Sequence, residues 1–138
     1  RGDKTLHVTL PWPPRALSPN TRHAHWSQLA KAKRRYRQAC HLEALAGHCR
    51  LMRLAPDERL HLTLLFVPPD RRARDLDNLI ASMKSGLDGV ADALGVDDSR
   101  WALTCSIDER EIGGMVWVAI EWDKVVRGAA IAGAVPPW

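Results

Sequence analysis

The sequence is poor in cysteine and has no long apolar run, and each lack excludes a class of protein. Its three cysteines, Cys40, Cys49 and Cys105, form no closely spaced pair, which argues against a disulfide framework and against a zinc ribbon. No apolar stretch approaches the roughly 18 residues of a membrane span, and the first residues lack the apolar core of a signal peptide. We therefore expect a cytoplasmic protein that does not engage a membrane.

Acidic residues are scarce in one part of the chain and abundant in another. Residues 21–53 carry eight lysines and arginines against one acid, Glu43, so that their local net charge is +7. Residues 75–111 carry nine acids against three bases, a local net charge of −6. The basic part is typical of a surface that binds phosphates, whereas the acidic part would repel a nucleic acid unless cations intervened.

The spacing of apolar residues predicts the fold. Alternation predicts strands over 5–10, 60–67, 101–107 and 115–122, with Gly113-Gly114 as the turn between the last two. Helical spacing predicts helices over 27–46 and 77–94. We expect one α/β (α+β) domain over residues 1–124, with two main helices in the order β-α-β-α-β-β. Residues 125–138, rich in small residues and with two prolines near the end, are expected to form a flexible C-terminal tail.

The stretch RARDLDN, residues 72–78, places two aspartates one residue apart at the end of an arginine run. Within a helix, residues i and i+2 lie about 200° apart, so both carboxylates can serve one site only if Asp75 is extended and Asp77 begins the helix. Negative charge is also favoured at that helix end. Ala81, Lys84 and Asp88 follow Asp77 along one stripe of the helix.

A second acidic motif, GVDDSR, places Asp97 and Asp98 between that helix and the next strand. A straight helix would hold this motif far from Asp75 and Asp77. Two arrangements would bring them together: a break in the helix near Ser85-Gly86 or Gly89, or a second subunit that completes the region. The sequence leaves both open.

Several carboxylates among arginines predict metal-assisted phosphodiester chemistry. Hard oxygen ligands bind Mg²⁺ or Mn²⁺, which stabilise charge on a phosphodiester and activate the attacking water. A nearby lysine can stabilise the developing charge. Taken singly, an Asp-x-Asp is more often a helix cap and an Asp-Asp more often a turn. Their combination around one helix is more specific, and it favours the catalytic interpretation.

The motif PPDRRARDLDNLI, followed by a helix and VDDSR, resembles the signature of the RusA-type Holliday-junction resolvases, which are common in phages and prophages. LPWPP after the first strand resembles the family's opening. The resemblance covers roughly residues 5–122, and its specific part is 68–100. It implies a small mixed sheet and a homodimeric, Mg²⁺-dependent (or Mn²⁺-dependent) endonuclease of a bacterial or phage-infected cell. Such an enzyme resolves four-way junctions in branched DNA, during recombination and repair, by paired symmetric incisions.

Carried over by position, the resemblance implies that Asp75, Asp77 and Asp98 are catalytic and bind the metal, with Asp97 beside them. The family's lysine falls four residues after the second aspartate, where this chain has Ala81. Lys84, one turn further along the same stripe, is expected to act in its place, because a long side chain can reach back toward the start of the helix.

The basic residues are predicted to contact DNA rather than to form a solvated helix face, and His23 and His25 are expected to face DNA rather than zinc. The predicted DNA-binding residues are Arg22, His23, His25, Lys31, Lys33, Arg34, Arg35, Arg37, Arg71, Arg72 and Arg74; Trp26 is the best candidate for an aromatic contact. Three alternatives stay open: a non-catalytic protein that binds branched DNA, a metal-dependent nuclease for flaps or single strands, and a basic interaction domain without nucleic-acid binding.

Overall fold

The computed structural model describes residues 5–124 and confirms the expected α+β class. In chain order its elements are β1 (Thr5–Pro11), the 3-10 turn η1 (Arg15–Leu17), α1 (Trp26–Ala46), β2 (Glu58–Val67), α2 (Leu76–Ser82), α3 (Lys84–Leu94), the 3-10 turn η2 (Asp98–Arg100), β3 (Trp101–Ile107) and β4 (Met115–Lys124). The predicted tail, 125–138, lies outside the described residues. Within residues 5–124, no helix combines the length and the apolarity needed to cross a membrane.

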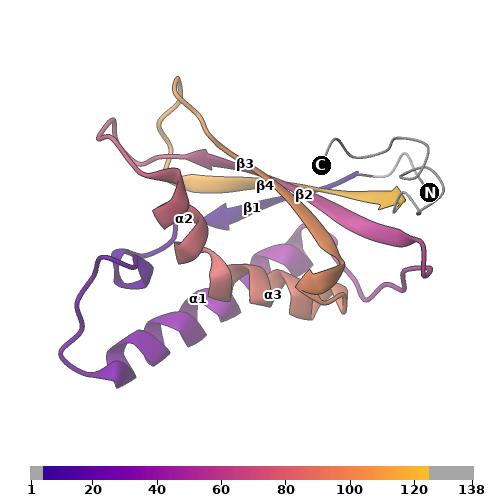
Figure 1. Ribbon diagram of the computed structural model, residues 1–138, viewed down its shortest axis with the longest axis horizontal. Helices are drawn as coiled ribbons and strands as arrows, with labels where there is room; N and C mark the ends of the chain where they lie inside the picture. The colour runs from indigo at the N-terminus through magenta and orange to yellow at the C-terminus, as the bar shows by residue number, and fades with distance from the viewer. Residues whose placement is uncertain (1–4, 125–138) are drawn as a thin grey trace, which may run out of the picture.

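The four strands form one mixed sheet in the order β1-β4-β2-β3 (Figure 1). β3 runs parallel to β2, and the other two pairings are antiparallel. The last two strands are joined through Gly113-Gly114, as expected, but they are not neighbours, because β2 lies between them. The turn docks on the end of β2, where the Gly114 N–H donates to the Val67 carbonyl at 2.9 Å, and Gly114 has a φ of +75° that favours glycine.

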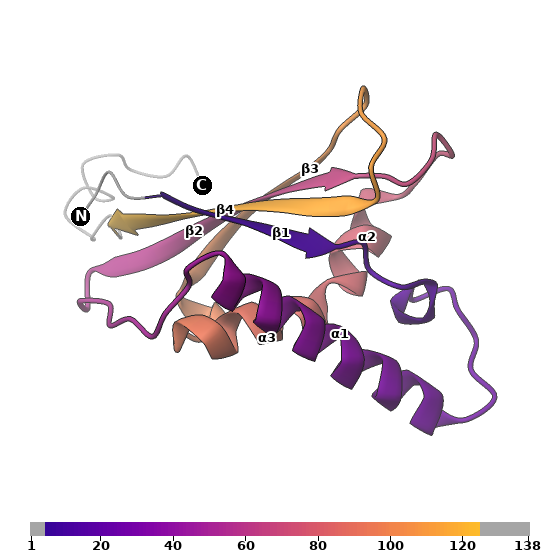
Figure 2. The same ribbon diagram turned by 180° about the vertical axis from the view of Figure 1, so that it is seen from behind.

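The helices cover a single face of the sheet, and the core lies between the two layers (Figures 1 and 2). Alternate residues of the central strand β2 point into this core, and Leu60, Leu62, Leu64 and Phe66 are fully buried there. Cys40 and Cys49 are buried among them, as expected of small apolar side chains, and burial raises the pKa of the Cys40 thiol to about 12.

The second predicted helix is broken, but not where its glycines suggest. The break is at Met83, between α2 and α3, whereas Gly86 and Gly89 lie inside α3. Both glycines face α1 at close range: a Cβ on Gly86 would come within 2.5 Å of the Tyr36 ring, and one on Gly89 would overlap the carbonyl oxygen of Arg37. The glycines therefore permit close packing of α3 on α1 rather than bending the helix.

Replacing Gly86 by alanine is expected to lower the free energy of unfolding by roughly 1 to 3 kcal/mol, because the new methyl group must displace Tyr36. The Tyr36 hydroxyl is held by the Pro11 carbonyl at 2.6 Å, so the ring has little freedom to move. Chemical denaturation of Gly86→Ala would measure the loss, with Ser27→Ala on the exposed start of α1 as the control. A variant as stable as the parent would contradict this account of the helix interface.

Candidate functional site

The two aspartates of RARDLDN adopt the backbone geometry that the sequence predicts. Asp75 is the N-cap of α2, in extended conformation with φ −92° and ψ 120°, and Asp77 lies in the first turn. The Asp75 carboxylate accepts a hydrogen bond from the Asp77 backbone N–H at 3.3 Å. Both side chains are exposed to solvent. Both carboxylates therefore lie at the N-terminal end of α2, where a bound molecule can contact them.

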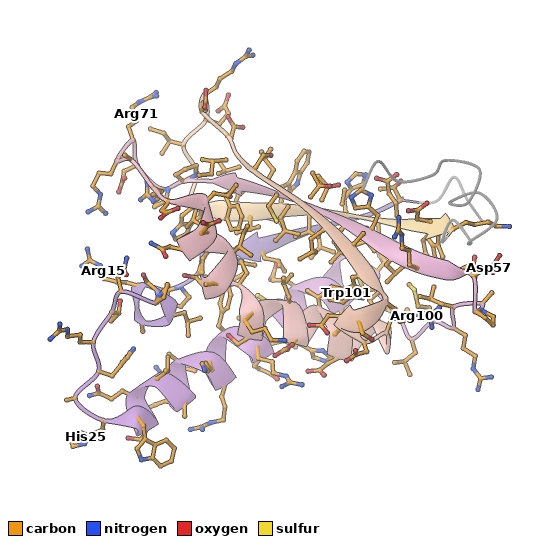
Figure 3. All side chains as sticks on the ribbon, in the orientation of Figure 1. Arg15, His25, Asp57, Arg71, Arg100 and Trp101 are labelled. Carbon is orange, nitrogen blue, oxygen red and sulfur yellow. The ribbon has the colours of Figure 1, made fainter. Side chains whose placement is uncertain are left out.

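Asp75 also forms part of the wall of a cavity of about 370 Å³ between η1 and the start of α2. The cavity combines apolar side chains from two proline-rich segments with basic and polar groups. Its lining residues are Trp12, Pro13, Pro14, Arg15, Ser18, Pro69, Arg72, Arg74, Asp75, Asn78, Leu79 and Ser82. Figure 3 shows Arg15 and Arg71 at the same end of the molecule, far from Arg100 and Trp101.

Arg74 holds the 70–74 turn together rather than projecting into solvent. Its side chain is 15% exposed and pairs with the Asp70 carboxylate at 2.9 Å, while it also donates to the carbonyls of Asp70 and Arg72. The guanidinium lies over the Trp12 ring, 5.4 Å from its centroid. Arg72 donates to the same carboxylate, and this hydrogen bond lowers the pKa of Asp70 to about 2. Arg74 therefore stabilises the 70–74 turn, which precedes Asp75 and lines the same cavity.

Lys84 contacts the second acidic motif. Its ammonium donates to Asp98 at 3.1 Å and to Asp88 at 3.2 Å. Both hydrogen bonds raise the pKa of Lys84, and the bond to Asp98 contributes most. The direction differs from the expected one: Lys84 extends along α3 toward Asp98, not back toward Asp77. The break at Met83 explains this, because it interrupts the stripe that a continuous helix would have formed.

Asp97 and Asp98 have different surroundings. The Asp97 carboxylate caps η2 by accepting from the Ser99 N–H at 3.0 Å, and hydrogen bonding by the Ser99 side chain, followed by this backbone bond, lowers the pKa of Asp97. Asp98 instead faces Lys84. Asp98, which the sequence favours as the functional residue, is thus the member of the pair that does not cap the turn.

The three predicted metal ligands are not gathered within one chain. Among residues 5–124, no group of three or more Asp, Glu, His or Cys side chains is placed to hold one ion. Mg²⁺ is often held by only one or two carboxylates together with water and substrate phosphates, and the exposed pair Asp75 and Asp77 fits that kind of site. Asp98 as a third ligand stays a prediction, because the broken helix does not bring it into such a group.

The predicted DNA-binding residues lie largely on exposed surface at one end of the fold. None of the first ten residues of α1 is buried, and this half of the helix extends beyond the sheet (Figure 2). The exposed members of the predicted set are Arg22, His25, Lys31, Lys33, Arg34, Arg35, Arg37, Arg71 and Arg72, and Trp26 is exposed as well.

Four of the predicted DNA contacts have partners within the protein: Arg72 and Arg74 pair with Asp70, and Arg37 and His23 have partners of their own. Arg37 forms a two-point ion pair with Asp92 at 2.7 and 2.9 Å, which raises the pKa of Arg37 and ties α1 to α3. His23 donates through Nε2 to the Ala16 carbonyl at 2.8 Å and so holds the loop that follows η1. Their contact with DNA stays a prediction.

Sequence reasoning missed Trp12, Arg15 and Asn78 as members of the site. Asn78 belongs to the quoted motif RARDLDN, and the proline-rich LPWPPR segment was visible as a strand end, so both signals were present. What the sequence did not give is that the strand end and the motif lie against each other. That contact depends on the sheet order, which brings β1 and β2 to either side of β4.

Comparison with known proteins places the chain in a family without giving it a function. No protein-family model matches the sequence. A solved structure, the periplasmic domain of Helicobacter pylori MotB, aligns with 94% of this chain and 89% of that chain, at 11% identity and a TM-score of 0.34. A protein of Xylella fastidiosa (strain Temecula1 / ATCC 700964), described as uncharacterized, is 40% identical over 114 residues, which are 82% of this chain and 74% of the relative. The chain therefore belongs to the same family as this Xylella protein.

Proposed function

We propose that the protein is a metal-dependent endodeoxyribonuclease that resolves four-way DNA junctions as a homodimer. The observation that carries the proposal is the position of Asp75: an exposed carboxylate, with Asp77 beside it, borders a cavity that is also lined by Arg15 and Arg72. Carboxylates next to guanidinium groups suit a phosphodiester that is bound and cut at one place.

Each group has a defined task in this proposal. Asp75 and Asp77 would hold a Mg²⁺ or Mn²⁺ ion, which would activate a water and stabilise charge on the phosphate. Arg15 and Arg72 bind the phosphates on either side. Lys84 contributes a positive charge, with Asp98 orienting its ammonium. The exposed bases of α1 bind the flanking DNA backbone, so affinity should fall steeply with salt.

The proposal is tested by incubating the purified protein with a labelled mobile four-way junction, in Mg²⁺ and in chelator, against an equimolar linear duplex. Metal-dependent, paired nicks confined to the junction would support it. Equal cutting of flaps or single strands would move the specificity to another nuclease class. Salt-sensitive binding without cutting would favour the non-catalytic alternative. The observation that supports this alternative is that Asp75, Asp77 and Asp98 do not form one metal-binding group within the described chain.

Symmetric cutting requires two sites related by a two-fold axis, and the sheet offers a surface for the second copy. No described element covers the face of the sheet opposite the helices (Figures 1 and 2). One row across this face is uncharged, with Thr9 paired to Trp117 and Trp117 to Leu65, and Trp117 is 52% exposed. A large exposed aromatic residue on an uncharged row is typical of the centre of an interface.

Trp117→Lys is therefore expected to convert the dimer into a monomer, because a charge would be buried at the centre of the interface without a partner. Sedimentation equilibrium of the parent and the variant would measure the change. Leu51→Lys is the matched control, since Leu51 is even more exposed, at 79%, but lies in the loop between α1 and β2. A parent that is monomeric, or a Trp117→Lys variant that remains dimeric, would remove this face from the assembly.

A further inference from the structure

The cavity beside Asp75 has two polar groups that the fold itself does not use. Most of its polar lining is engaged: Arg72 and Arg74 pair with Asp70, Asp75 caps α2, and the Ser82 hydroxyl donates to the Asn78 backbone carbonyl. Within residues 5–124, neither the Arg15 guanidinium nor the Asn78 side-chain amide has a hydrogen-bond partner. Arg15 is exposed and Asn78 is partly buried, and both line this cavity, so a ligand with an anionic group and a hydrogen-bonding edge can reach both side chains.

The remaining walls are apolar and rigid. Trp12 is fixed from two sides, by the Arg74 guanidinium over its ring and by Phe66 in an edge-to-face contact at 6.0 Å. Pro14 and Pro69 line the cavity with little conformational freedom to lose on binding. Flat, preorganised apolar walls suit a planar heterocycle. The volume, about 370 Å³, is near the lower limit for ligand pockets, which suits one nucleotide and excludes a duplex.

We propose that this cavity binds a single deoxynucleotide of the cleaved strand, with its base between the proline and tryptophan walls, its edge on Asn78 and its phosphate on Arg15. The proposal rests on the proposed function for the identity of the strand, but nucleotide binding itself does not require cleavage. A base held in this way next to Asp75 would make the position of the cut depend on the DNA sequence.

The test is a calorimetric titration with the four deoxynucleoside 5′-monophosphates and with inorganic phosphate. Arg15→Ala is expected to weaken all five ligands about tenfold, the effect of one charge-assisted hydrogen bond. Asn78→Ala is expected to weaken the preferred nucleotide several-fold and to leave inorganic phosphate unchanged. Arg53→Ala, which removes an exposed arginine from the loop before β2, is the control and should change nothing.

The results separate the two proposals. Nucleotides that bind no better than phosphate, or an Asn78→Ala variant that binds all four as the parent does, would overturn the nucleotide site. Nucleotide binding without any junction cleavage would retain the site and overturn the resolvase. Where the parent cuts, the distribution of cut positions along the junction should broaden in Asn78→Ala; an unchanged distribution would also count against the site.

Discussion

Asp75→Asn is expected to abolish Mg²⁺-dependent cleavage of a four-way junction while leaving the affinity for the junction unchanged or higher. In the proposed site, the substitution would remove one of two charged metal ligands and one negative charge close to the phosphate. It keeps the structure, because Asp75 caps α2 through one side-chain oxygen and asparagine caps a helix about as well as aspartate. Loss of activity would therefore report on the carboxylate and not on the fold.

The measurement is single-turnover cleavage of a labelled junction, with binding followed separately in chelator. Asp97→Asn is the matched control, because Asp97 also caps a short helix through its carboxylate and asparagine retains that cap. The control should cut at close to the parent rate. An Asp75→Asn enzyme that cuts as fast as the parent would remove Asp75 from the mechanism.

The sequence predicted those parts of the fold that depend on local pattern. Each predicted strand exists, with ends that move by at most two residues, and α1 begins one residue earlier than expected and ends at residue 46, as predicted. The extended Asp75 followed by a helix was also predictable, because an aspartate before a run of helical spacing is a common N-cap. Hydrophobic periodicity and helix capping depend on residues that are close in sequence, so the sequence alone predicts them.

The features that depend on distant contacts were not predictable in the same way. Gly86 and Gly89 suggested a break because glycine disfavours helices, yet both are helical, since α1 needs the space that a side chain would fill. The break falls at Met83, which is fully buried and lies 3.2 Å from the Tyr36 hydroxyl. For the same reason Lys84 is turned toward Asp98, a contact between residues 14 positions apart that no helical stripe indicates.

Lys84→Ala is expected to slow junction cleavage by about a hundredfold, the usual effect of removing one group that stabilises charge in the transition state. Asp98 and Asp88 fix the position of the ammonium, while the Lys84 side chain stays 70% exposed and can meet a bound phosphate. Exposed ion pairs contribute at most about 1 kcal/mol to stability, so the variant should remain folded. The rate and the thermal transition of the same preparation would check both statements.

Two further variants distinguish a role in the reaction from a role in the fold. Lys84→Arg keeps the positive charge and should recover part of the lost rate, whereas a purely structural lysine would give no such rescue in the cleavage rate alone. Asp88→Asn removes the partner one turn along α3 but leaves the contact between Lys84 and Asp98, so its rate should stay within a few-fold of the parent. Unchanged turnover in Lys84→Ala would mean that another cation acts at the phosphate, and Arg15 and Arg72, which line the cavity beside Asp75, would be the next to replace.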